Sequence, residues 1–105
     1  MTAKTRKQQL EEMLAEEPND TFLHYGLAME HVSAGDYAAA VERFRKLLEV
    51  DARYVPAYMQ GGLALQRLGR DAQAREFWQR GVVEARQQGN QHAADEMQGM
   101  LERLD

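Results

Sequence analysis

The fold is decided by the stretch from His24 to Ala52, which reads HYGLAMEHVSAGDYAAAVERFRKLLEVDA and has a second copy 34 residues further along the chain. Glycine, alanine and bulky aromatic positions recur at this spacing, as Gly35 and Gly69, Ala40 and Ala74, and Phe44 and Trp78. A period of this length with helical residues inside it is typical of stacked helix–turn–helix repeats. One copy cannot bury its own apolar face, so the second copy is expected to stack on the first.

The spacing of apolar residues predicts six helices joined by short turns, hence an all-α fold. Thr5 and Gln8 have the spacing of a capping box, so the first helix is expected to start at Thr2 or Thr5 and to run to about residue 16. The others are expected at about 20–33, 37–50, 56–68, 71–86 and 90–104. Gly35 is placed to end a helix with left-handed backbone, and Asp36 to cap the next one.

Length and composition indicate one compact helical domain. The 105 residues are 44% hydrophobic and 29% charged, with two prolines and no cysteine, which excludes disulfides and thiolate chemistry. The net charge is -4 and no segment is basic enough for a nucleic-acid footprint. No apolar run reaches signal-peptide length or the roughly 20 residues of a membrane span. A cytoplasmic protein with no nucleic-acid or membrane partner is therefore expected.

Candidates for catalysis or metal binding are few. His24 and His31 lie seven residues apart on one helical face. That is about 10 Å along the axis, too far for these two alone to share a metal ion, so a packing role is expected. Ser33 is the only serine, and no base or oxyanion hole accompanies it. The sequence has no HExxH motif and no phosphate-binding glycine loop, and we expect no enzyme, no cofactor and no metal.

The repeated positions resemble the tetratricopeptide repeat family. Its pattern reads Trp, two residues, Leu-Gly, two residues, Tyr, then Ala, three residues, Phe, and a closing Pro. The matching positions are His24, Leu27-Ala28, His31, Ala40, Phe44 and Ala52 in the first copy, and Tyr58, Gly61-Gly62, Leu65, Ala74, Trp78 and Arg86 in the second. Both copies lack the proline, and the histidines are unusual replacements for aromatic residues. The resemblance implies an α-α superhelix, a solenoid of about six antiparallel helices.

The register divides the single domain of residues 1–105 into two full repeats, 21–54 and 55–88, with half-repeats at both ends. Pro18 lies 34 residues before Ala52, so the helix in 1–18 corresponds to the second helix of a missing repeat. The helix in 89–105 corresponds to the first helix of a following one. Because the ends of a solenoid need covering, we expect both to act as caps.

The resemblance also implies that the first helix of each hairpin lines a concave groove for a peptide or helix of a partner protein. By register, the groove-facing residues would be Phe22, Tyr25, Met29, Ser33, Met59, Leu63, Gln66, Arg67 and Met97. Chaperone-binding members clamp a terminal carboxylate with Lys and Asn, but Tyr25 and Met29 stand at such positions here. A groove rich in methionine and aromatic residues suits an apolar or amphipathic ligand.

Three uses of this groove are open at the level of sequence. The chain is expected to be a small adaptor or scaffold for another protein. Alternatively, the groove residues pack against the chain's own terminal helices, since a wide apolar arc is first of all core. In the third case the chain is a self-associating structural unit, and two copies form a homodimer by burying their grooves against each other.

Overall fold

The computed structural model describes residues 3–104, and within them the chain forms six α-helices and no strand. The helices are α1 (Arg6–Glu16), α2 (Thr21–Ser33), α3 (Tyr37–Val50), α4 (Val55–Arg67), α5 (Asp71–Gln87) and α6 (Gln91–Leu104). The all-α prediction is confirmed, and the helix bounds agree with the predicted ones to within one or two residues.

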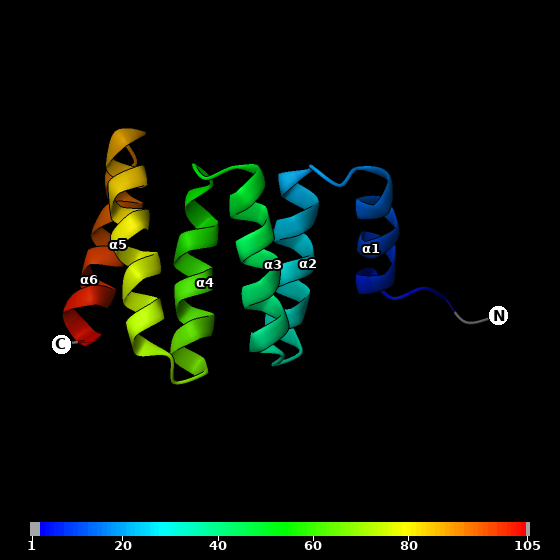
Figure 1. Ribbon diagram of the computed structural model, residues 1–105, viewed down its shortest axis with the longest axis horizontal. Coiled ribbons are helices and arrows are strands. Elements are labelled where there is room, and N and C mark those ends of the chain that lie inside the picture. Colours follow the sequence, from blue (N-terminus) through cyan, green and yellow to red (C-terminus); the bar gives the residue numbers. More distant parts are fainter. Residues whose placement is uncertain (1–2, 105) are drawn as a thin grey trace.

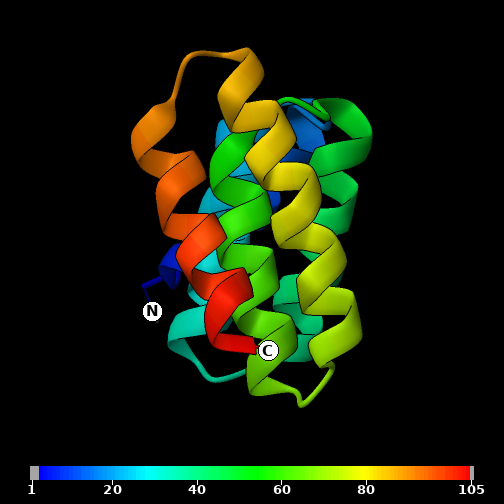
Figure 2. The ribbon, with the colours of Figure 1, turned by 90° about the vertical axis from the view of Figure 1, so that its left-hand side faces the viewer.

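The helices stand in one row, with α1 at one end and α6 at the other, and each runs antiparallel to the next (Figure 1). Each helix packs on its neighbour in the sequence, which gives an elongated body of 50 × 28 × 20 Å. Seen along the long axis, α2, α4 and α6 lie on one side and α3 and α5 on the other (Figure 2). We call these two sides the first-helix layer and the second-helix layer.

The repeat of the sequence is visible in the helix bounds. Both ends of α4 lie 34 residues after the ends of α2. The starts of α3 and α5 have the same offset, although α5 runs three residues beyond the image of α3. The two hairpins therefore have nearly the same layout and follow one another along the row.

Three turns share one backbone geometry. Gly35, Gly69 and Gly89 follow α2, α4 and α5 with φ angles of 75°, 76° and 72°, in the left-handed region that favours glycine. The predicted stops at Gly35 and Gly69 are thereby confirmed. In the first two turns the chain then reverses directly into the second helix of the same hairpin.

Side chains cap four of the six helices. At α1 the hydroxyl of Thr5 accepts from the backbone N–H of Gln8, and the side-chain oxygen of Gln8 accepts from the N–H of Thr5. This capping box identifies Thr5 as the start; the alternative, Thr2, lies outside the described residues. The remaining caps are Asp20 for α2, Asp36 for α3 and Asn90 for α6.

Small residues let the two helices of each hairpin approach closely. Ala28 and Ala40 are fully buried in the first hairpin. In the second, a Cβ atom added to Gly62 would overlap the indole of Trp78, and one added to Gly61 would overlap the ring of Phe77. The cost of about 1 kcal/mol for a glycine inside a helix is thus offset by packing that no other residue permits.

The buried residues form two separate clusters. The larger one runs from α2 to α6 and includes Phe44, Tyr58 and Trp78. The smaller one joins α1 to α2 through Leu10, Leu14, Leu23 and Leu27. Met13 of α1 is 51% exposed, because that helix is covered on one side only.

Candidate partner-binding site

An open cavity of about 250 Å³ lies over α2, at the end of the first-helix layer nearest α1. Its lining consists of Arg6, Phe22, Tyr25, Gly26, Met29, Glu30 and Ser33. We call it the α2 cavity. It brings together all four residues that the repeat register selected from the first copy, because positions 22, 25, 29 and 33 recur on one face of a helix.

Tyr25 forms a fixed wall of this cavity. Its ring lies 6.1 Å from that of Phe44 and 5.6 Å from that of Tyr54, measured between centroids. Burial, and secondarily the nearby hydroxyl of Tyr54, raises the pKa of Tyr25 above its ordinary value of 10.0. The hydroxyl is therefore neutral near pH 7, and the wall is aromatic and uncharged.

Phe22 and an ion pair flank the opening. The Phe22 side chain is 69% exposed, far more than is usual for a large apolar residue. Nε of Arg6 lies 2.9 Å from Oε1 of Glu30, which bridges α1 and α2 at the edge of the cavity. The cavity therefore combines an exposed aromatic ring with a charged rim, as protein-binding patches often do.

Arg6, Gly26 and Glu30 were missed by the sequence reasoning. Arg6 belongs to α1, and its approach to α2 depends on how the two helices dock. Gly26 gave no signal either, because a Cβ atom there would lie 3.5 Å from the side chain of Leu10, in ordinary van der Waals contact.

The four residues predicted from the second copy do not line the α2 cavity. Met59 and Leu63 are half-buried and pack against the larger core cluster. Gln66 and Arg67 are exposed at the end of α4. The two copies thus contribute separate surfaces to the first-helix layer.

Met97 is a core residue and presents no surface to a partner. Its side chain is 0% exposed. A Cβ atom added to Gly81 of α5 would overlap the sulfur of Met97 and lie 2.7 Å from Cβ of Tyr58. Our expectation that Met97 faces the groove is therefore wrong. The thioether of Met97 occupies the space left by Gly81, and this contact joins α6 to α5.

The histidines lie apart from the α2 cavity. His24 is 5% exposed, and its Nε2 donates to the carbonyl oxygen of Pro18 at 2.8 Å, which secures the turn between α1 and α2. Among residues 3–104 no group of three or more acidic or histidine side chains could hold a metal ion. In the same part of the chain no helix is long and apolar enough to cross a membrane.

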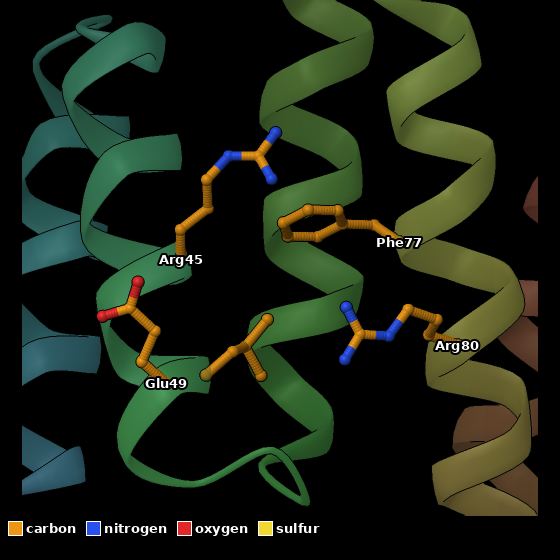
Figure 3. A pocket seen from close by; sticks show the side chains of 5 residues that line it. Arg45, Glu49, Phe77 and Arg80 are labelled. Atoms are coloured by element: carbon orange, nitrogen blue, oxygen red, sulfur yellow. The ribbon is translucent and has the colours of Figure 1, made fainter.

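A second open cavity, of about 270 Å³, lies on the second-helix layer. It is lined by Arg45, Leu48, Glu49, Phe77 and Arg80, and we call it the α3–α5 cavity. Figure 3 shows Arg45 reaching in from α3 and Arg80 from α5, with the ring of Phe77 between them. No residue of this cavity was predicted as a site residue.

The chain is similar to known proteins over nearly its whole length, although no family model matches it. It is 34% identical over 96 residues to the TPR repeat-containing protein PA0015 of Pseudomonas aeruginosa, covering 91% of each chain. The solution structure of protein BPP2914 from Bordetella parapertussis superposes with a TM-score of 0.83 at 30% identity, over 97% of this chain and 89% of that one. A tetratricopeptide repeat domain protein of Salinibacter ruber gives 0.78 at 32% identity, over 84% and 89%.

Proposed function

The chain belongs to the tetratricopeptide repeat family, and we propose that it is a non-catalytic adaptor that holds a peptide or helix of another protein in the α2 cavity. The fold in general mediates contacts with protein partners. The observation that carries the finer proposal is the convergence of Phe22, Tyr25, Met29 and Ser33 on one open cavity.

The lining of the cavity favours a ligand that presents an apolar side chain with polar groups beside it. Phe22 and Met29 offer exposed and half-buried apolar surface, which a ligand would remove from water. Arg6 and Glu30 present both charges at the rim, so polar groups beside an apolar anchor can be accommodated. An amphipathic helix satisfies both requirements.

We further propose that α1 and α6 cap the two repeats. Arg6 occupies the register position of Ala40, and Glu96 that of Gly62, where small residues allow a hairpin partner to approach. The Arg6 side chain is 64% exposed and that of Glu96 is 43% exposed. A charged side chain at this position disfavours the docking of another helix and keeps the ends of the row solvated.

Substitutions on α2 test the adaptor proposal. The partner is first purified by affinity capture from the source cell, and its affinity is then measured with purified Met29→Glu and Phe22→Ser. Both should weaken binding at least tenfold, because each removes apolar contact. Phe22→Ser is the safer variant, since that side chain is exposed and contributes little to the fold.

Val83→Glu is the matched control, because Val83 is 53% exposed on α5, away from the α2 cavity. It should leave the affinity unchanged. Equal affinity of Phe22→Ser and the wild type would contradict the assignment of the α2 cavity. Circular dichroism of every variant excludes loss of helix as the cause.

A homodimer formed through the same cavity is the alternative, and the exposure of Phe22 favours it equally. Sedimentation of the wild type at micromolar concentration distinguishes the two. A dimer that Phe22→Ser converts to a monomer supports self-association. A monomeric wild type rules it out.

A further inference from the structure

The α3–α5 cavity holds two arginines whose side chains are positioned by aromatic rings. The guanidinium carbon of Arg45 lies 5.2 Å from the centroid of the Phe77 ring, and that of Arg80 lies 5.4 Å from the centroid of the Tyr58 ring. The two rings are themselves 6.3 Å apart in an edge-to-face contact. Both cations are thus held beside one aromatic pair rather than extending freely into water.

Hydrogen bonds fix the same two side chains further. A terminal nitrogen of Arg45 donates to the side-chain oxygen of Gln73 at 2.9 Å. A terminal nitrogen of Arg80 lies 3.4 Å from the hydroxyl of Tyr58, which in turn donates to the carbonyl oxygen of Ala52 at 2.6 Å. Each guanidinium retains several N–H groups for another acceptor, because the group carries five donors.

Neither cation has an ion-pair partner, although Glu84, one turn after Arg80 on α5, lines a neighbouring hollow together with it. Within residues 3–104, no carboxylate forms an ion pair with Arg45 or Arg80. Glu49 stands at the α3 side of the cavity (Figure 3), so the charged groups of the lining comprise two cations and one anion. The five residues of the lining therefore carry a formal charge of one positive unit.

We propose that the α3–α5 cavity binds a carboxylate side chain, aspartate or glutamate, of an acidic segment in a partner protein. The carboxylate accepts hydrogen bonds from Arg45 and Arg80. The methylene groups behind it rest on Leu48 and Phe77, the apolar part of the lining. Planar guanidinium groups suit carboxylate oxygens in this role.

A carboxylate fits this cavity better than a phosphate does. A single negative charge balances the formal charge of the lining, and Glu49 repels a doubly charged phosphate more strongly than a singly charged carboxylate. The site lies on the second-helix layer, away from the α2 cavity, so it does not depend on the function proposed for that cavity.

The test uses the whole chain labelled with nitrogen-15 and a defined probe. The probe is a short capped peptide in which glutamate and leucine alternate, and its glutamine counterpart is the neutral control. The glutamate peptide should shift the amide signals around Arg45, Phe77 and Arg80 in a saturable manner, and the effect should weaken with added salt. The glutamine peptide should not.

Single substitutions then assign the binding. Arg45→Gln and Arg80→Gln should each weaken the affinity for the glutamate peptide about tenfold, since each removes a charge-assisted hydrogen bond. Glu49→Gln should tighten it, because a repelling charge is removed; a purely structural role of the cavity would not produce this gain. Arg86→Gln, an exposed arginine outside the lining, is the control and should leave the affinity unchanged.

Three outcomes would overturn the proposal. Equal shifts from the glutamate and glutamine peptides would mean that the negative charge of the peptide does not contribute to binding. Saturable shifts from inorganic phosphate without shifts from the glutamate peptide would identify a different oxyanion. Unchanged affinity in both arginine variants would place the binding elsewhere, and none of these results bears on the α2 cavity.

Discussion

The indole nitrogen of Trp78 donates a hydrogen bond to the backbone carbonyl oxygen of Met59 across 3.2 Å. This contact joins α5 to α4, and it exists because Gly62 leaves room for the ring. A Cβ atom at Gly62 would lie 2.5 Å from Cε2 and 2.6 Å from Cδ1 of Trp78. The absence of one methyl group therefore sets the distance between these two helices.

Gly62→Ala should lower the free energy of unfolding by about 1–3 kcal/mol, because overpacking outweighs the gain in helix propensity. Gly99→Ala is the matched control. Its added Cβ atom would meet only the guanidinium of Arg103, at 3.5 Å, and it should raise the stability by up to about 1 kcal/mol. Urea unfolding followed by Trp78 fluorescence measures both. Stabilisation by Gly62→Ala would contradict the close approach of α4 and α5.

Arg70→Asp should raise the stability by about 0.5–2 kcal/mol by supplying an N-cap. Arg70 precedes α5 without a side-chain cap, whereas Asp36, at the same register position of the first hairpin, accepts from the N–H of Ala39. Asp36→Ala is the reciprocal variant and should cost a similar amount. Thermal melting of the two variants beside the wild type provides the measurement, and changes of the same sign would be inconsistent with the capping argument.

Alkaline pH should destabilise the fold through Tyr25 and Tyr54. Burial raises the pKa of both hydroxyls above 10.0, with Tyr54 further raising that of Tyr25, and Asp51 that of Tyr54. The unfolded chain therefore loses these protons first as the pH rises. The contribution of the two neutral hydroxyls to the free energy of unfolding is fully present below pH 10. It is lost as the pH rises from their pKa in the unfolded chain through their pKa in the folded chain.

Urea midpoints measured from about pH 8 to pH 11 test this dependence. Tyr25→Phe and Tyr54→Phe should each give a shallower decline than the wild type, since a phenyl ring cannot ionise. Identical slopes in all three proteins would show that other groups cause the alkaline effect.

The fold could be predicted because its signals are local and repeated. Gly35 and Gly69 mark the same turn, and the spacing of Phe22, Tyr25, Met29 and Ser33 follows from the period of one helix. The face that these residues share needs no knowledge of the tertiary structure. Their meeting in one cavity followed from that face.

The features that the sequence did not predict depend on how the helices dock or on positions where the two copies differ. Met97 lies in the core because Gly81, a residue of another helix, leaves space for its sulfur. The α3–α5 cavity has no signature in the repeat, since the register equivalents of Arg45 and Phe77 are Gln79 and Arg43. A site built from positions that differ between the two copies cannot be found by comparing the residues that the copies share.

The separation of the two core clusters has a consequence for local unfolding. The helix α1 is held by Leu10 and Leu14 against α2, and this cluster is distinct from the one that joins α2 to α6. Detaching α1 leaves the larger cluster intact. The backbone amides of α1 should therefore exchange with solvent through an opening of lower free energy than the one that exposes the amides of α4 and α5. Since Arg6 lines the α2 cavity, the helix that we expect to open before α4 and α5 is also a wall of the candidate binding site.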